Sequence, residues 1–199
     1  MKGTASNNNT ITNCKTDNNN DAGLQITAGA HNNLVQGSFS FYNYDIGTKG
    51  SNADGFACKL AAGAGNKFIS CNSYNNSDDG WDLIGTDEAV TITGCASYDN
   101  KAAGFAQNNS AASLSLTNCK AYQNGANNTL NANQKTIKAN FNFPYNPGNG
   151  HVFTFTDCTT TGNCNIYSGA IVIRGNVTAT SANNPLPTVP GINNQFIKR

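Results

Sequence analysis

Polar and apolar residues alternate along this chain in short runs, and clusters of Asn, Asp and Gly separate one run from the next. The stretches "HVFTFTDC" and "AVTITGC" illustrate the alternation. A period of two residues places the apolar side chains on one face of a β-strand, whereas the turn-forming clusters end each run. The pattern therefore predicts many short strands that are joined by tight turns.

The predicted strands belong to an internal repeat that is marked by cysteine. Cys71, Cys95 and Cys119 are spaced 24 residues apart, and Ser38 follows Cys14 at the same interval. A further copy of the repeat begins at "HVFTFTDC". Because each copy is too short to contain a helix as well as several strands, the repeat predicts a solenoid built from strands alone.

Two positions in each copy are regularly apolar and predict the core. The first position holds Ile11, Phe68, Ile92 and Leu116, and the second, just after a turn glycine, holds Leu24, Phe56, Trp81 and Phe105. Leucine-rich repeats have a similar length, but their Leu-x-x-Leu-x-Leu frame is absent. We therefore predict an all-β chain that forms a single parallel β-helix, with about 24 residues per rung.

The repeat has two irregular parts. The copy that contains Ser38 is longer than the others, because "YNYDIGTKGSNAD" inserts a loop over residues 42–53. The segment "SANNPLPTVPGINNQ" contains prolines that exclude regular central strands. We predict β-helix rungs over residues 1–165 and an irregular C-terminal cap over residues 166–199.

The cysteines and asparagines are predicted to be architectural. Cysteines that repeat in register point the same way from adjacent rungs, which suits small buried thiols better than disulfide bonds. No paired Cys-x-x-Cys motif indicates a zinc site. Asparagine tolerates the left-handed conformation at turns and can stack its side-chain amide from rung to rung.

The overall charge excludes some classes of partner. The formal net charge is only +1, so no strong field is expected to recruit nucleic acid or a membrane surface. No apolar run approaches the roughly 20 residues of a membrane-spanning helix. The start "MKGTASNNNT" lacks the apolar region of a secretory signal. We expect a soluble monomer that is intracellular, already mature, or cut from a longer precursor.

Acidic residues cluster in one place, although only 12% of the chain is charged. The stretch "NNSDDGWDLIG" contains Asp78, Asp79 and Asp82, and Asp54 occupies the equivalent of the Asp79 position one rung earlier. Asp82 is expected to point outward, because its two neighbours in the strand point inward. Stacking the rungs therefore brings four carboxylates to one lateral edge.

Such a cluster predicts a metal site. Unpaired carboxylates repel one another, and a hard divalent cation relieves the repulsion. Ca²⁺ accepts a flexible set of carboxylates, carbonyls and waters, whereas Mg²⁺ demands stricter geometry. Aspartate is also common in turns, but Ala22 and Ala103 occupy the equivalent position in the flanking rungs. The turn itself therefore does not require an acid.

The motifs "NNNDAGLQIT", "NADGFACKL", "NSYNNSDDGWDL" and "SYDNKAAGFAQNN" resemble the pectate lyases of polysaccharide lyase family 9. They occur in the order of that family and cover roughly residues 7–128. The resemblance implies a right-handed parallel β-helix, secretion, and cleavage of polygalacturonate by β-elimination. It also implies a Ca²⁺ site, which maps onto Asp54, Asp78, Asp79 and Asp82 in this chain.

The chain departs from that family at one rung. In the family, a rung that carries the catalytic lysine follows the "DDGWDL" rung, but here the regular spacing of the cysteines leaves no place for it. The position equivalent to the base holds Ala106. Lys101, which is expected beside Asp78 on the next rung, is the best remaining candidate for the base. Lys49 and Lys59 are candidates for binding an acidic sugar.

Three functions remain open from the sequence. The first is a calcium-dependent pectate lyase with weak or altered activity, and the second is a non-catalytic binder of acidic polysaccharide that keeps the metal site. The third is a structural or ice-binding solenoid, because outward Thr and Ser residues recur in the strands. Leu34, Gln36, Lys67 and Ile69 interrupt that polar row.

Overall fold

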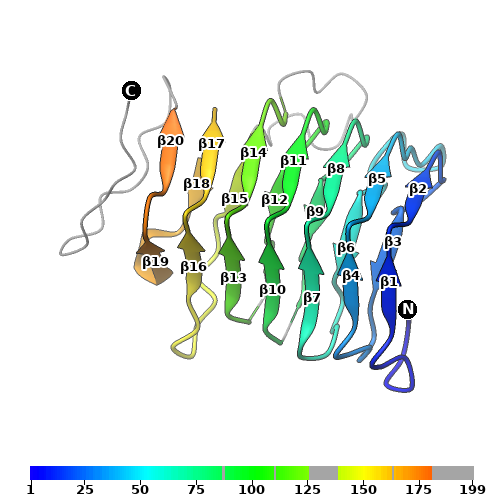
Figure 1. The fold of residues 1–199 in the computed structure, drawn as a ribbon, viewed down its shortest axis with the longest axis horizontal. Helices are drawn as coiled ribbons and strands as arrows, with labels where there is room; N and C mark the ends of the chain where they lie inside the picture. Colours follow the sequence, from blue (N-terminus) through cyan, green and yellow to red (C-terminus); the bar gives the residue numbers. More distant parts are fainter. Residues whose placement is uncertain (87, 110, 126–138, 163, 181–199) are drawn as a thin grey trace.

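The computed structural model of the chain describes residues 1–86, 88–109, 111–125, 139–162 and 164–180. In this part of the chain, twenty short strands wind into a right-handed parallel β-helix with three strands in each complete rung (Figure 1). The fold class predicted from the sequence is therefore confirmed. The described residues include no helix that is long and apolar enough to span a bilayer.

The β1 sheet is the first of three stacks that run along the solenoid, and all its pairings are parallel. It joins β1 (Thr10–Thr12), β4 (Leu34–Gln36), β7 (Asn66–Ile69), β10 (Val90–Thr93), β13 (Leu114–Thr117), β16 (Phe153–Thr156) and β19 (Ile171–Arg174). Its alternating burial matches the predicted inward and outward positions.

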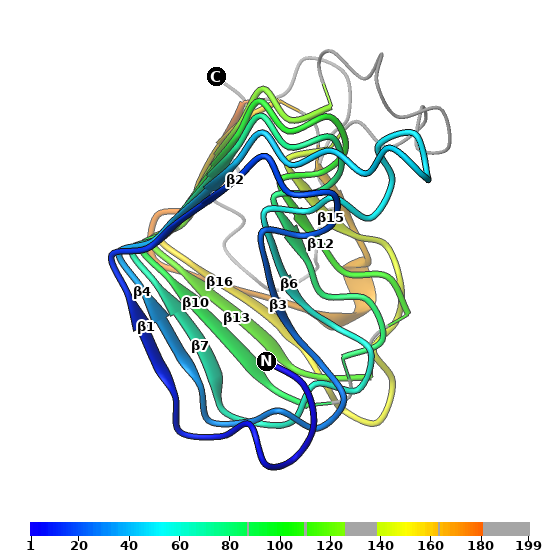
Figure 2. The same cartoon turned by 90° about the vertical axis from the view of Figure 1, so that its right-hand side faces the viewer.

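The β2 sheet follows across a sharp corner (Figure 2). It joins β2 (Lys15–Asp17), β5 (Phe39–Phe41), β8 (Asn72–Tyr74), β11 (Ala96–Tyr98), β14 (Lys120–Tyr122), β17 (Thr159–Thr161) and β20 (Thr178–Thr180). On its outer face, one aromatic ring per rung stacks on the next at 4.9 Å, through Phe41, Tyr74, Tyr98 and Tyr122.

The β3 sheet closes each rung and carries the candidate site at its start. It joins β3 (Leu24–Ile26), β6 (Phe56–Cys58), β9 (Trp81–Asp82), β12 (Phe105–Ala106), β15 (Phe141–Phe143) and β18 (Cys164–Ile166). Phe105 pairs with Trp81 on one side and Phe141 on the other. No rung separates β9 from β12, so Ala106 lies directly beside Asp82, as the sequence spacing predicts.

The core is a set of ladders formed by equivalent residues of successive rungs. In the β3 sheet, the rings of Phe56, Trp81, Phe105 and Phe141 follow one another at centroid distances of 4.9, 4.7 and 5.3 Å; the first pair is tilted and the other two are stacked. Each of these side chains is at most 2% exposed. Burial of one large apolar side chain contributes about 1.5–3 kcal/mol, so these ladders stabilise the rungs in register.

Asparagine ladders hold the turns. At the corner between the β2 and β3 sheets, each side-chain amide donates to the next rung along the series Asn19, Asn43, Asn76, Asn100, Asn124 and Asn140. Asn18 and Asn75, among others, adopt the left-handed backbone conformation at these turns. Both predicted roles of asparagine are confirmed, and the ladder satisfies buried polar groups of the backbone.

The strands continue beyond residue 165, which corrects the predicted boundary of the β-helix. After the 3₁₀ turn Ser168–Ala170, β19 pairs with β16 and β20 pairs with β17. The apolar, β-branched run from Ile171 to Ile173 favours a strand, and the prolines that suggested an irregular cap come later in the sequence. The rest of the predicted cap, residues 181–199, lies outside the described residues.

All seven cysteines are free thiols, as predicted, and Cys14 alone is exposed. Burial raises the pKa of Cys58 and of Cys164 to about 12. Since a thiol reacts as its exposed thiolate, we expect a thiol reagent such as an aromatic disulfide to modify one cysteine in the native protein and all seven after unfolding. Mass spectrometry of the labelled peptides should identify Cys14; fast labelling of Cys71 or Cys95 would contradict this packing.

Candidate metal centre

Two of the acidic residues of the candidate metal site lie directly before turn glycines. Asp54 and Asp79 precede Gly55 and Gly80, which lie just before β6 and β9. The Gly55 amide donates to the Asp79 carbonyl at 2.9 Å. A Cβ atom on Gly55 would lie 1.8 Å from Ser73 Oγ. Only glycine fits this close approach, so the turn fixes the two aspartates in equivalent positions on adjacent rungs.

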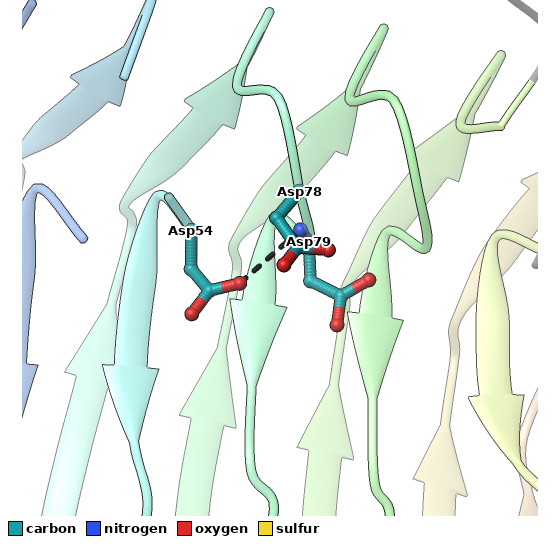
Figure 3. Close-up of side chains that lie close together, drawn as sticks. All are labelled: Asp54, Asp78 and Asp79. Atoms are coloured by element: carbon teal, nitrogen blue, oxygen red, sulfur yellow. Dashed lines mark hydrogen bonds between the residues drawn. The ribbon is translucent and has the colours of Figure 1, made fainter. Parts of the chain in front are cut away.

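Three carboxylates meet at this edge of the solenoid. Asp54, Asp78 and Asp79 each offer an oxygen within 4.8 Å of the other two, and they are only 1%, 2% and 3% exposed. Figure 3 shows Asp54 before one strand and the other two at the turn before the next. Stacking of adjacent rungs, rather than proximity in sequence, brings Asp54 to the other two residues.

Backbone amides orient the three carboxylates. The Asp79 amide donates to Asp54 Oδ1 at 3.2 Å, and the Ala103 amide on the following rung donates to Asp79 Oδ1 at 2.6 Å. The Asn52 amide donates to Asp78 Oδ2 at 2.5 Å. Hydrogen bonds of this kind preorganise the oxygens.

The inserted loop forms one wall of the site. In Figure 2 it projects beyond the outline of the neighbouring rungs. Ser77 Oγ donates to the Gly50 carbonyl at 2.7 Å, which joins the loop to the residue before Asp78. Lys49 is exposed in this loop and has a φ of 57°. The loop therefore holds Asp78 through its backbone while it presents Lys49 to solvent.

Asp82 lies beside this group and is engaged by Lys59. The Lys59 ammonium contacts Asp54 Oδ2 and Asp82 Oδ2, both at 2.8 Å. Asp82 is 7% exposed, and its Oδ1 accepts the Ile84 amide at 2.9 Å. The structure thus groups three of the four predicted ligands, Asp54, Asp78 and Asp79. The fourth, Asp82, is linked to Asp54 through the ammonium of Lys59.

Burial and mutual repulsion disfavour the charged form of this cluster. Burial raises the pKa of Asp54 and of Asp79 well above the usual range, and nearby carboxylates raise both further. Burial alone would lower the pKa of Lys59, but the carboxylates of Asp54 and Asp82 outweigh it and raise that pKa. Lys59 is thus held in its protonated form, which a general base cannot use.

The donor set fits a hard divalent cation. Among the described residues, the Lys59 ammonium pairs with two of the four buried aspartates, Asp54 and Asp82, and the side-chain oxygens of all four are potential ligands of a cation. Oxygen donors from flexible carboxylates are the ligands that Ca²⁺ prefers, and carbonyls and waters can complete its shell. Asp54, Asp78 and Asp79 are the residues placed to hold such an ion.

Lys101 lies on the next rung, close to the acidic group through its backbone. The Lys101 amide donates to the Asn76 carbonyl at 2.9 Å, and the Ala102 amide donates to the Asp78 carbonyl at 3.2 Å. The Lys101 side chain is half-buried. This rung position agrees with the prediction from the repeat; the assignment of Lys101 as a base stays a prediction.

The sequence did not reveal the ion pairs of Lys59. The sequence suggested that Lys59 projects outward at the end of the strand that follows Asp54, where it could bind an acidic sugar. The register was the available signal, because Ala57 pairs with Asp82 and Lys59 lies only two residues beyond Ala57. The amides of Asn52 and Ala103 could not be found from residue types at all.

Comparison with known proteins agrees with this architecture. A sequence model of the family described as "Pel9A-like, right handed beta helix region" matches residues 1–100. The crystal structure of pectate lyase Pel9A superposes with a TM-score of 0.70 and 26% identity, over 92% of this chain and 50% of that chain.

Two curated relatives are similar over part of the chain. Pectate lyase L of Dickeya dadantii (strain 3937) is 42% identical over 84 residues, which cover 42% of this chain and 20% of the relative. Pectate lyase L of Thermoclostridium stercorarium is 45% identical over 84 residues, 38% of this chain and 7% of the relative. The matched segment therefore spans a fifth or less of these two relatives.

Proposed function

Because the chain belongs to the Pel9A-like right-handed β-helix family, we propose that it is a calcium-dependent pectate lyase that cleaves polygalacturonate by β-elimination. The observation that carries the proposal is the buried group of Asp54, Asp78 and Asp79, whose oxygens lie within 4.8 Å of one another. The names of the relatives support pectate as the substrate. We further propose that the protein acts outside the cell as a monomer.

Binding of the substrate would combine metal and lysine contacts. A uronate carboxylate is an oxygen donor, so it can complete the shell of an ion held by the three aspartates. Lys49 is exposed on the loop beside Asp78 and can pair with a second uronate along the same polymer. An acidic polysaccharide, with one carboxylate per sugar, therefore suits this edge better than a neutral one.

The proposed reaction begins with loss of the C5 proton beside the substrate carboxylate. The Lys101 amine accepts this proton, and the electrons of the broken C–H bond form a C4–C5 double bond. The bond from C4 to the glycosidic oxygen breaks, and that oxygen keeps the electron pair and takes a proton from water. Asp54, Asp78 and Asp79 would hold the Ca²⁺, which would supply positive charge close to the substrate carboxylate. The transfer requires the neutral amine of Lys101, because a protonated amine has no free electron pair.

A non-catalytic binder of acidic polysaccharide is the second candidate. The observation that favours it is the direct pairing of β9 with β12, which puts Ala106 beside Asp82 where a base is needed. Such a protein would keep the cation bridge to the polymer without the proton transfer. A structural or ice-binding role is weaker, because Lys67 and Ile69 pair with Thr91 and Thr93 and interrupt the outward threonine row.

The ultraviolet absorbance of the unsaturated uronide distinguishes these candidates. We expect it to rise when the protein is mixed with polygalacturonate and Ca²⁺ at alkaline pH, and to stop rising when a chelator is added. The Lys101→Ala variant should lose at least about 100-fold in rate, since general-base catalysis contributes about 10²–10⁴-fold, while it still binds Ca²⁺. The Lys120→Ala variant, one rung further along, is the matched control.

No rise in absorbance from a protein that binds Ca²⁺ and retains the polymer on a pectate column would favour the binder. Unchanged turnover in the Lys101→Ala variant would refute Lys101 as the base without affecting the metal site.

A further inference from the structure

We propose that Lys59 is a tethered counter-ion of the acidic site, and that an incoming divalent cation displaces its ammonium from Asp54 and Asp82. This inference rests on the proposed Ca²⁺ site and adds a role for a residue of the chain itself. In the absence of metal the ammonium pairs with Asp54 and Asp82, and in the presence of metal the same ammonium becomes available to a substrate carboxylate.

The Lys59 side chain is buried and lies between two aspartates. Its side chain is only 8% exposed, and its ammonium lies 2.8 Å from an oxygen of each of two aspartates on adjacent rungs. Asp54 lies five residues earlier in the chain, so the side chain turns back along β6 toward the start of that strand. Ala57, the outward residue between them, is small enough to allow this path.

Asp54 takes part both in the ion pair with Lys59 and in the group of three carboxylates. One of its oxygens accepts from Lys59, and the residue also forms the three-carboxylate group with Asp78 and Asp79. A divalent cation bound by that group would lie close to the ammonium, and the two positive charges repel. Asp54 and Asp82 are therefore sites at which Lys59 and a metal ion compete.

Displacement of Lys59 would free a fourth carboxylate to bind the metal ion. Asp82 Oδ2, which now accepts from Lys59, becomes able to join Asp54, Asp78 and Asp79 around the ion. The displaced ammonium remains attached to the end of β6, next to the bound cation. A uronate that approaches the cation would then meet a second positive group, which couples metal binding to binding of the acidic polymer.

The Lys59→Met variant of the full chain tests this competition, because methionine keeps most of the apolar stem and removes the charge. Calorimetric titration with Ca²⁺ should show an affinity about tenfold higher or more than that of the unmodified protein. Thermal unfolding in chelator should occur at a lower temperature, and the rise produced by Ca²⁺ should be larger. Lys67→Met, on the outer face of β7, should change neither quantity.

A different result is expected if Lys59 serves only to stabilise the fold. In that case Lys59→Met would bind Ca²⁺ with equal or lower affinity and would unfold earlier both with and without the ion, and the inference would be overturned. Failure of the unmodified protein to bind Ca²⁺ would instead overturn the proposed site itself. The two failures are thus distinguishable by titration of the unmodified chain.

Nuclear magnetic resonance of the unmodified protein provides a second test that does not depend on the variant folding. The Lys59 ammonium protons should be protected from exchange in chelator, because the group is buried and paired on two sides. Saturation with Ca²⁺ should bring them into rapid exchange with water. Protection that persists at saturating Ca²⁺ would contradict displacement.

Discussion

Replacement of Asp79 by asparagine is expected to weaken Ca²⁺ binding by more than about 100-fold, since changes outside the ligand shell already cost about 10- to 100-fold. Asp79 is 3% exposed and lies in the three-carboxylate group. Asparagine is nearly isosteric, and its carbonyl oxygen can still accept the Ala103 amide. The variant should therefore remain folded while it loses one of the charges that hold the ion.

Stability measurements make this prediction specific. Removal of one buried carboxylate relieves repulsion from Asp54 and Asp78, so the unfolding temperature of Asp79→Asn in chelator should equal or exceed that of the unmodified protein. The increase produced by Ca²⁺ should disappear. Asp99→Asn is a suitable control, because Asp99 has a positive φ that asparagine tolerates and lies outside the group. An Asp79→Asn variant with normal Ca²⁺ affinity would refute the site.

The Gly80→Ala substitution is expected to destabilise the protein by about 3 kcal/mol, at the upper end of the usual cost of overpacking. A Cβ atom at this position would lie 2.0 Å from Ser97 Oγ and 2.5 Å from the Gly104 carbonyl oxygen. The second contact is with backbone, so side-chain rotation cannot relieve it and the adjacent rungs must separate. Denaturant titration in chelator measures the effect.

A matched control comes from the inserted loop. At Gly47 the nearest atom to an added Cβ is Asp45 Oδ1 at 3.2 Å, which is the end of a side chain in an exposed segment. Gly47→Ala should change the free energy of unfolding by no more than about 0.5 kcal/mol. Equal stabilities of the Gly80→Ala and unmodified proteins would contradict the close contact between rungs.

The fold could be predicted from the sequence because each rung repeats the same physical requirements. The spacing of Cys71, Cys95 and Cys119 sets the register, and alternation around Phe68 and Ile92 sets which side chains point inward. In the structure these residues pair as the repeat requires, for example Ile92 with Phe68. A one-residue slip would expose the whole apolar set, so the register is strongly determined.

The acidic site could be predicted only in part. Equivalence of Asp54 and Asp79 in the repeat was sufficient to bring them together, whereas the ion pairs of Lys59 depend on side-chain conformation and on the small Ala57. The contacts from the inserted loop to Asp78 could not be predicted, because the loop is not part of the 24-residue repeat. The end of the β-helix was misjudged for the same reason, because β19 and β20 follow a 3₁₀ turn that the repeat does not contain.

Calorimetric titration of the unmodified chain with Ca²⁺, before and after the addition of short oligogalacturonate, tests the central claim most directly. We predict saturable binding of a single ion that is abolished by chelator and tightened by the oligosaccharide, because the uronate carboxylate completes the shell of the ion. Absence of saturable binding by a protein whose circular dichroism shows the folded β-structure would contradict the account.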